Sequence, residues 1–298
     1  MEKLFFTNTD GARVHYLKWE ALGAKCAVVI SHGMVEHPAR YADLAAFLNK
    51  NNISVYGIYH IGHGEDAETL RHMGEGDFMR CISNLSELVD IVREETGLPV
   101  ILLGHSMGSF MSQLYVTRYK NIDALILSGS TKAASIAKIG AGVAKVVNAL
   151  SRDKKKPSFF LNAMAFGSYN KKYDNVKCVY DWLSRDRREV KKYINDPLCG
   201  GICSIGFFRN LTWGMAEMGK IKHIKNVDLK LPIYIQGGGM DPVSDYGKGL
   251  YALKKQYDDL GVERVELTVY DGARHEIFNE TNKAEVYENT LAFINSLF

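Results

Sequence analysis

The sequence of 298 residues lacks a long uninterrupted apolar run. Its N-terminus, Met-Glu-Lys-Leu-Phe-Phe, has no apolar stretch of the kind that marks a secretory signal. The longest weakly polar segment, Ala133 to Leu150, is interrupted by Lys138 and Lys145, so it falls short of the roughly 20 apolar residues of a membrane span. We therefore expect a cytoplasmic protein that is soluble or peripheral to a membrane.

Cysteine is scarce, and its five copies are scattered at positions 26, 81, 178, 199 and 203. An odd number of cysteines in a large chain is typical of a reducing compartment rather than of a disulfide framework. Cys199 and Cys203 have no matching His pair nearby, and His60 and His63 lack a third ligand at a usable spacing. The sequence therefore predicts no metal site and no cofactor.

An excess of charge of one sign is also missing, since 37 Lys and Arg stand against 34 Asp and Glu. The net charge of +3 is far below the basic excess of nucleic-acid-binding proteins, so we expect no nucleic-acid partner. With 46% apolar residues, 27 Gly and 6 Pro, the composition is that of an ordinary globular protein.

Short β-rich runs alternate with longer helical patterns along most of the chain. Continuous apolar runs at 27–30, 100–103 and 124–127 suit strands that are covered on both faces. The pattern predicts an α/β fold with a mostly parallel eight-stranded sheet and helices on both faces. The predicted strands span residues 3–7, 13–19, 26–31, 54–59, 100–104, 124–128, 233–237 and 265–270. The helices expected between them span residues 41–50, 81–96, 109–119, 245–260 and 283–298.

The alternation stops between residues 131 and 227, where the pattern is helical throughout. We interpret 131–227 as an inserted helical cap, or lid, on an α/β core formed by 1–130 and 228–298, because open α/β sheets bind ligands at the carboxyl ends of their strands. Residues 132–192 carry fifteen Lys or Arg against five Asp or Glu, a balance of +10 that leaves −7 for the rest of the chain. The cap therefore faces either an anionic membrane or solvent.

The cap is rich in bulky apolar side chains that could wall an acyl tunnel. The alternative for each is simple packing of the cap against the core, because most large apolar residues are buried. Four of them are candidate substrate-binding residues: Phe159, Phe166, Phe207 and Trp213.

The most specific local pattern is Gly104-His105-Ser106-Met107-Gly108, which joins an apolar strand to a predicted helix. Gly-x-Ser-x-Gly in this context is typical of a nucleophile elbow, where small residues let strand and helix approach and the serine hydroxyl is exposed beside the helix N-terminus. We predict that Ser106 is a catalytic nucleophile.

A serine hydroxyl is a weak nucleophile at neutral pH and needs a histidine base that a carboxylate orients. Asp241 and His275 each follow the end of a predicted strand. The order Ser106, Asp241, His275 is that of the α/β-hydrolase architecture. Asp245 and Asp271 are rival acids, but Asp271 lies too close to His275 in sequence to approach easily from another strand end.

The tetrahedral intermediate of acyl transfer needs two backbone N–H donors, one after the nucleophile and one from a loop after an earlier strand. Met107 follows Ser106, and Met34 follows His32-Gly33 at the end of the strand 26–31. We predict an oxyanion hole formed by the amides of Met34 and Met107. The alternative for His32-Gly33 is a simple turn.

Together, several motifs resemble the monoacylglycerol lipase and lysophospholipase branch of the α/β-hydrolases, including its bacterial members. These motifs are His32-Gly33-Met34-Val35-Glu36-His37 with Arg40-Tyr41, Gly62-His63-Gly64, Gly104-His105-Ser106-Met107-Gly108, Asn195-Asp196-Pro197-Leu198-Cys199-Gly200, Asp241-Pro242-Val243 and Ala273-Arg274-His275-Glu276. The resemblance covers essentially the whole chain and implies hydrolysis of a carboxylic ester on a long acyl chain, through an acyl-serine and without a cofactor. Two positions depart from the pattern: Val35 stands where a small residue is common, and Tyr59-His60-Ile61 where Asp-x-Arg is frequent.

These observations predict a serine ester hydrolase whose partner is a small lipid such as a monoacylglycerol or a lysophospholipid. A general carboxylesterase, an acyltransferase and an aminopeptidase can use the same triad, so they stay open as alternatives. A non-catalytic ligand-binding protein on this fold is disfavoured because the triad set is intact. We expect His37, His60, His63 and His105 to be structural, since His275 already supplies the base.

Overall fold

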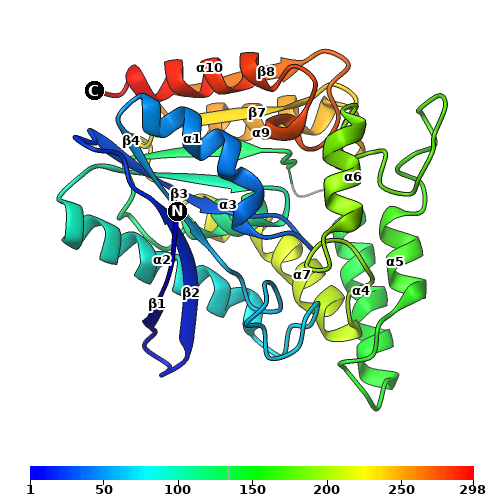
Figure 1. The fold of residues 1–298 in the computed structure, drawn as a ribbon. Helices are drawn as coiled ribbons and strands as arrows, with labels where there is room; N and C mark the ends of the chain where they lie inside the picture. The colour runs from blue at the N-terminus through cyan, green and yellow to red at the C-terminus, as the bar shows by residue number, and fades with distance from the viewer. Residues whose placement is uncertain (133–134) are drawn as a thin grey trace.

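Eight strands form one mixed sheet in the computed structural model, which describes residues 1–132 and 135–298, with side chains given outside 133–141 (Figure 1). The strands are β1 Glu2–Thr7, β2 Arg13–Trp19, β3 Cys26–Ser31, β4 Ile53–Ile58, β5 Val100–His105, β6 Ala124–Ser128, β7 Ile233–Gly238 and β8 Val265–Tyr270. Their order is β1-β2-β4-β3-β5-β6-β7-β8, in which β1 and β2 are antiparallel to their neighbours and the others are parallel. The predicted mostly parallel sheet is confirmed, and every strand boundary lies within one residue of its prediction.

The central strands β3, β5 and β6 are buried at every residue, as their apolar runs predict. The parallel register pairs Ser31 with Gly104, and His105 with Ser128. The carboxyl ends of the three strands therefore meet at one edge of the sheet. The loops that follow them carry the predicted nucleophile and oxyanion donors.

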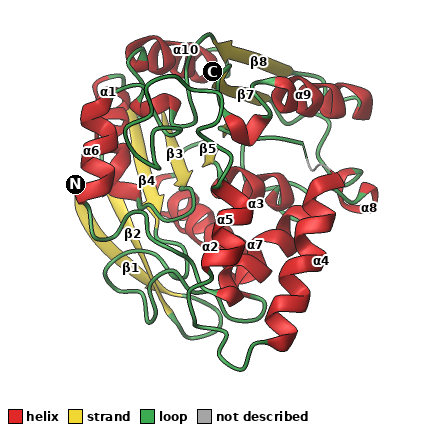
Figure 2. Ribbon diagram, turned by 90° about the vertical axis from the view of Figure 1, so that its right-hand side faces the viewer, coloured by secondary structure: helices red, strands yellow, loops and turns green. Residues whose placement is uncertain are grey.

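Helices cover both faces of the sheet, each over its own apolar core (Figure 1 and Figure 2). Helices α1 Ala42–Lys50 and α10 Lys283–Asn295 bury their apolar residues on one face. Helices α2 Asp77–Thr96, α3 Met107–Tyr115 and α9 Lys248–Leu260 do so on the other. Three short 3-10 helices connect these elements: η1 Pro38–Tyr41, η2 Pro242–Ser244 and η3 Ile277–Asn279.

Helix α2 begins at Asp77, earlier than the predicted start at Cys81. Gly76 adopts φ +80°, which ends the preceding turn. The Asp77 carboxylate accepts a hydrogen bond from the Gly74 amide at 2.6 Å. Phe78 is buried in the same core as Cys81 and Ile82, three and four residues further on, so the apolar stripe of the helix begins one turn earlier than predicted.

Among the described residues between β6 and β7 lie five helices, and we call the segment 135–227 the insert. They are α4 Ser135–Leu150, α5 Phe159–Phe166, α6 Arg187–Asn195, α7 Ile205–Met218 and α8 Ile221–Ile224. Helices α4, α5 and α6 gather at one end of the sheet (Figure 1). Helix α7 packs on α3 and α2, and its Phe207 and Phe208 are buried in the same core as those helices.

The division at 131 and 227 into a core and a cap stays a prediction. The first residues of the weakly polar segment, Ala133 and Ala134, lie outside the described residues. Among the residues that are described, no helix combines the length and the apolar character needed to cross a membrane.

We expect Phe207→Ala to lower the free energy of unfolding by about 3–5 kcal/mol, because this side chain is fully buried in the main core. Phe159→Ala is the matched control, since it removes the same atoms from a side chain that is 73% exposed and should cost less than about 0.5 kcal/mol. Urea unfolding of both variants measures the difference. A loss below about 1 kcal/mol for Phe207→Ala would contradict the packing of α7 into this core.

Candidate active site

Ser106 occupies a strained turn between β5 and α3. Its backbone angles are φ +52° and ψ −119°, which non-glycine residues rarely adopt. Strand and helix approach so closely that a Cβ on Gly104 would lie 2.7 Å from the Gly108 carbonyl oxygen, and a Cβ on Gly108 would overlap the Ser31 carbonyl. The close approach therefore requires both glycines of the motif.

His275 and Asp241 form a buried hydrogen-bonded pair, with 2.9 Å between Nδ1 and Oδ2. Asp241 follows β7, and its other carboxylate oxygen accepts from the Val243 amide at 2.9 Å. Burial lowers the pKa of His275, but the charge and hydrogen bond of Asp241, with the charges of Glu276 and Glu36, outweigh burial and raise this pKa. Because Nδ1 donates to the carboxylate, Nε2 is the basic nitrogen.

The loop after β6 brings the Ser106 turn and His275 together. The Ser106 amide donates to the Ser128 carbonyl at 3.0 Å, and a Cβ on Gly129 would lie 3.0 Å from Cε1 of His275. Within the described parts of the chain, Ser106 Oγ makes no hydrogen bond with His275. Of the rival acids, Asp245 is exposed, as is Asp271, and the imidazole pairs with Asp241 instead.

The loop after β3 packs directly against the Ser106 turn. A Cβ on Gly33 would lie 3.2 Å from Cβ of Ser106. Met34, the next residue, is partly exposed, while Met107 is the first residue of α3. The two predicted oxyanion donors therefore belong to segments that flank the nucleophile turn on two sides.

Val35 holds the loop after β3 in a strained conformation, with φ +52°. A β-branched residue is unfavourable in this conformation, so Val35 stores backbone strain here. The Val35 amide donates to Nε2 of His63 at 3.1 Å, and its carbonyl accepts from the Gly200 amide of the insert at 2.9 Å. These two bonds hold the strained peptide from opposite sides.

Three buried histidines lie behind this loop. The ring of His32 lies 4.6 Å from that of His60 and 4.9 Å from that of His63, measured between centroids. Burial lowers the pKa of His32 and of His63 to about 3 and that of His60 well below its ordinary value. All three are therefore neutral, and a neutral imidazole carries one donor and one acceptor nitrogen. His63 donates from Nδ1 to the Ile61 carbonyl, which leaves Nε2 free to accept from Val35.

Comparison with known proteins places this site in a family. The family described as "Serine aminopeptidase, S33" matches residues 23–282. The chain belongs to this family. It is 29% identical over 298 residues to the monoacylglycerol lipase of Mycolicibacterium smegmatis. The match covers 98% of this chain and 96% of that protein. It is 27% identical over 300 residues to the monoglyceride lipase of Mus musculus, over 97% of this chain and 88% of that protein.

A solved structure supports the same assignment. The thermostable carboxyl esterase from Bacillus coagulans, in complex with glycerol, matches with a TM-score of 0.91 and 26% identity, over 99% of this chain and 98% of that chain. The predicted α/β-hydrolase fold and the resemblance to its monoacylglycerol lipase branch are confirmed.

In this S33-family chain, an aromatic cluster of the insert contacts His275. The ring centroid of Trp182 lies 4.9 Å from that of His275, and Tyr169 and Phe166 pack on Trp182 at 4.9 and 6.0 Å. Sequence analysis does not single out Trp182, because it lies in a loop where no periodicity distinguishes it from other apolar residues of the insert.

The four predicted substrate-binding residues do not share one location. Phe166 belongs to the cluster on His275, whereas Phe159 is 73% exposed on α5. Phe207 is buried with its ring centroid 5.6 Å from that of His63, and Trp213 packs on α2. Among contacts of the described residues, Phe166 is the member linked to His275, through Trp182. A role in substrate binding stays a prediction for all four.

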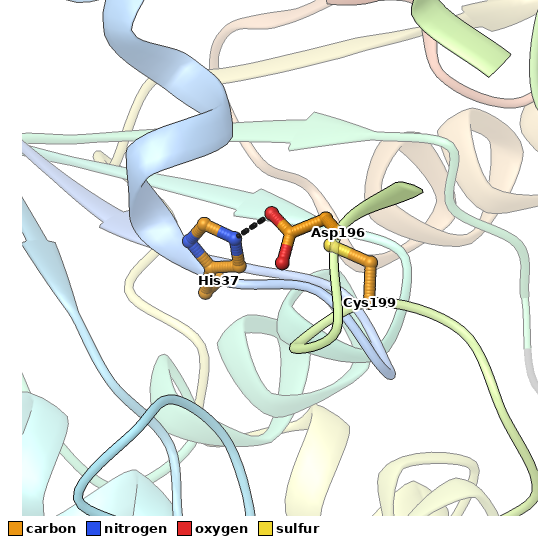
Figure 3. A group of neighbouring side chains, drawn as sticks. All are labelled: His37, Asp196 and Cys199. Carbon is orange, nitrogen blue, oxygen red and sulfur yellow. Dashed lines mark hydrogen bonds and ion pairs between the residues drawn. The ribbon is translucent and has the colours of Figure 1, made fainter. Parts of the chain in front are cut away.

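His37, Asp196 and Cys199 form a compact group where the insert meets η1 (Figure 3). Their potential ligand atoms lie within 4.8 Å of one another, and 2.7 Å separates Nε2 of His37 from Oδ2 of Asp196. Burial raises the pKa of the Cys199 thiol. The positive charge of Arg40 lowers this pKa, but by less than burial raises it. A protonated thiol and a neighbouring guanidinium do not favour a cation. We therefore interpret the group as a hydrogen-bonded link between insert and sheet.

We expect Gly129→Ala to slow labelling of Ser106 by a phosphonate probe about 100-fold, because the new Cβ would lie 2.9 Å from Cε1 of His105 and 3.0 Å from Cε1 of His275 and so displaces the base. The matched control is Gly97→Ala, which has a similar positive φ of +66° but no atom within 4 Å of the new Cβ. The backbone strain of either substitution costs on the order of 1–3 kcal/mol, so thermal unfolding should respond to both. Equal labelling rates for the two variants would contradict this role of Gly129.

Proposed function

We propose that this chain is a serine hydrolase that cleaves carboxylic esters of acyl chains, with monoacylglycerol or lysophospholipid-like substrates. The observation that carries the proposal is the buried pair of Asp241 and His275 beside the strained turn of Ser106. The names of the curated relatives, monoacylglycerol lipase and monoglyceride lipase, support an acylglycerol ester as the substrate.

Acylation begins when Ser106 Oγ attacks the carbonyl carbon of the ester and transfers its proton to Nε2 of His275. Asp241 stabilises the imidazolium, and the amides of Met34 and Met107 donate to the oxyanion of the tetrahedral intermediate. The intermediate collapses when the bond to the alcohol oxygen breaks. The alcohol takes the proton from Nε2 and leaves, and the acyl group stays on Ser106.

Deacylation repeats these steps with water. Nε2 of His275 accepts a proton from water as its oxygen attacks the acyl carbonyl, and the same two amides hold the second oxyanion. The bond to Ser106 Oγ then breaks, Oγ recovers the proton from Nε2, and the fatty acid leaves. No cofactor takes part in either half of this reaction.

The family description also names an aminopeptidase, which would use the same triad. Binding the amino terminus of a peptide calls for acidic groups near the site, but residues 132–192 of this chain carry a balance of +10. The ester is therefore the better supported substrate. An acyltransferase differs only in that an alcohol replaces water in the second half-reaction.

We expect Ser106→Ala to lower hydrolysis of p-nitrophenyl esters about 10⁴-fold or more, because the nucleophile is removed. A chain-length series should peak at medium or long acyl chains if the substrate is a lipid ester. Ser83→Ala on α2 is the matched control and should leave the rates unchanged. A short-chain maximum would indicate a general carboxylesterase, and full activity of Ser106→Ala would contradict the mechanism.

In the pH profile of kcat/KM, the loss of activity on the acidic side should have its midpoint above about pH 6.5, the ordinary pKa of histidine. Nε2 must be unprotonated to act as the base, and the pKa of His275 is raised, so activity is lost as pH falls through that raised value. In Asp241→Asn, kcat should fall about 10⁴-fold because the tautomer is no longer fixed. A wild-type midpoint below 6 would contradict this assignment of the base.

We also propose that this protein is cytoplasmic and that its insert makes peripheral contact with anionic membranes. Phe159 and Phe160 of α5 are 73% and 62% exposed, and α5 follows the basic run 154–156. Apolar side chains that enter the interface beside Lys residues are typical of such contact.

Co-sedimentation with phosphatidylcholine vesicles, with and without phosphatidylglycerol, tests the contact. We expect stronger binding to the anionic vesicles and a loss of binding in the double variant Phe159→Ser, Phe160→Ser. Leu22→Ser is the control, because Leu22 is 98% exposed but lies outside the insert. Equal sedimentation with both vesicle types would overturn the proposal.

A further inference from the structure

Arg40 is buried between two carboxylates that belong to different loops. Its Nη1 donates to Oε2 of Glu36 at 2.9 Å and to Oε1 of Glu276 at 2.5 Å, and its Nη2 donates to Oε2 of Glu276 at 2.7 Å. The three side chains are between 4% and 9% exposed. The guanidinium also packs 4.8 Å over the ring of Tyr193 in α6. One side chain thus contacts the loop after β3, the loop of His275 and the insert.

Glu36 extends this contact to the oxyanion loop. Its Oε1 accepts from the Gly33 amide at 2.6 Å and from the hydroxyl of Tyr41 at 2.9 Å. The next amide along the chain is that of Met34, the proposed oxyanion donor. The carboxylate therefore fixes the peptide from which this donor follows.

Glu276 extends the contact to the base, because it is the residue directly after His275. Its backbone amide donates to the Leu183 carbonyl at 2.7 Å, and Nδ2 of Asn279 donates to its Oε2 at 3.2 Å. Arg40 thereby joins the segment of the oxyanion donor to the segment of the base, through one bond to Glu36 and two bonds to Glu276. Sequence separation between Arg40 and Glu276 is 236 residues.

The three groups carry a net charge of −1, since one guanidinium faces two carboxylates. The other groups that face His275 are Asp241 after β7, the ring of His105 from β5 and the ring of Trp182. Burial lowers the pKa of His105 to about 4, so it is neutral. The residual charge of the cluster therefore adds to that of Asp241.

We propose that Glu36, Arg40 and Glu276 form a clamp that fixes the Met34 amide relative to His275 and favours the imidazolium formed during catalysis. They are positioning residues, because they contact the loops that carry Met34 and His275 rather than the reacting atoms. The kinetic consequences rest on the proposed ester hydrolysis, whereas the effect on His275 itself is measurable without turnover. A buried ion cluster contributes little net stability by itself, so stability alone does not account for this arrangement.

Glu276→Gln tests the charge, because it keeps the shape of the side chain and changes the net charge of the clamp from −1 to 0. We expect the pKa of His275 to fall by roughly half a pH unit, less than a lone carboxylate would cause because Arg40 neutralises part of the charge. NMR titration of ¹³C-labelled histidine rings measures this pKa, with the signal assigned by its loss in His275→Asn. Glu217→Gln, in an ion pair on α7, is the matched control and should leave the pKa unchanged.

Arg40→Lys tests the geometry, because an ammonium keeps the charge but cannot hold both carboxylates in the same fork. We expect kcat to fall about 10- to 100-fold, with KM changed less than about twofold and the acidic limb unmoved. Arg93→Lys, which breaks a comparable bond to Asp123 away from the site, is the control and should retain full activity. Thermal unfolding verifies that each variant is folded.

An unchanged pKa of His275 in Glu276→Gln would overturn the electrostatic role of the clamp. An unchanged kcat in Arg40→Lys would overturn its positioning role. If the wild-type protein hydrolyses no ester, the proposed function fails, and the NMR titration still decides whether the clamp acts on His275. If Arg40→Lys does not fold, Glu276→Gln decides the proposal.

Discussion

The left-handed backbone of Ser106 is the constraint on which the rest of the site depends. With φ at +52°, the turn joins β5 to α3 at a close approach, and this is possible because Gly104 and Gly108 carry no Cβ. The loop after β3 packs against the same turn through Gly33, and the end of β6 does so through the Ser128 carbonyl. One feature of the backbone therefore brings the predicted nucleophile close to the predicted oxyanion loop.

Sequence patterns predict the parts of this protein that depend on local order along the chain. Apolar runs set the strands to within one residue, and the succession of Ser106, Asp241 and His275 follows from where strands end. The clamp at Arg40 could not be predicted from the sequence, because its partner Glu276 is 236 residues away. Nothing in the sequence distinguishes this pair from a pair of charged residues on the surface. The role of Gly129 could not be predicted either, since the need for glycine there arises from a ring contributed by a distant loop.

The insert supports the candidate site through backbone hydrogen bonds. The carbonyls of Trp182 and Leu183 accept from the amides of His275 and Glu276 at 3.3 and 2.7 Å, and the insert also donates to Val35 through Gly200. These are backbone bonds, so side-chain patterns carry no sign of them. Helix α7 belongs to the insert, yet it adds buried aromatic side chains to the main core. The predicted division of the chain into a core and a cap therefore does not describe this packing.

The bonds from the insert to the His275 loop have a thermodynamic consequence. Any event that favours the docked arrangement of Trp182 and Leu183 also favours the position of the imidazole, and linkage makes this coupling reciprocal. A ligand that holds the imidazole in place would therefore also favour this arrangement of Trp182 and Leu183, and a contact that favours the arrangement would strengthen binding of that ligand. The arrangement of the insert and the orientation of the His275 imidazole are therefore linked through the same pair of backbone hydrogen bonds.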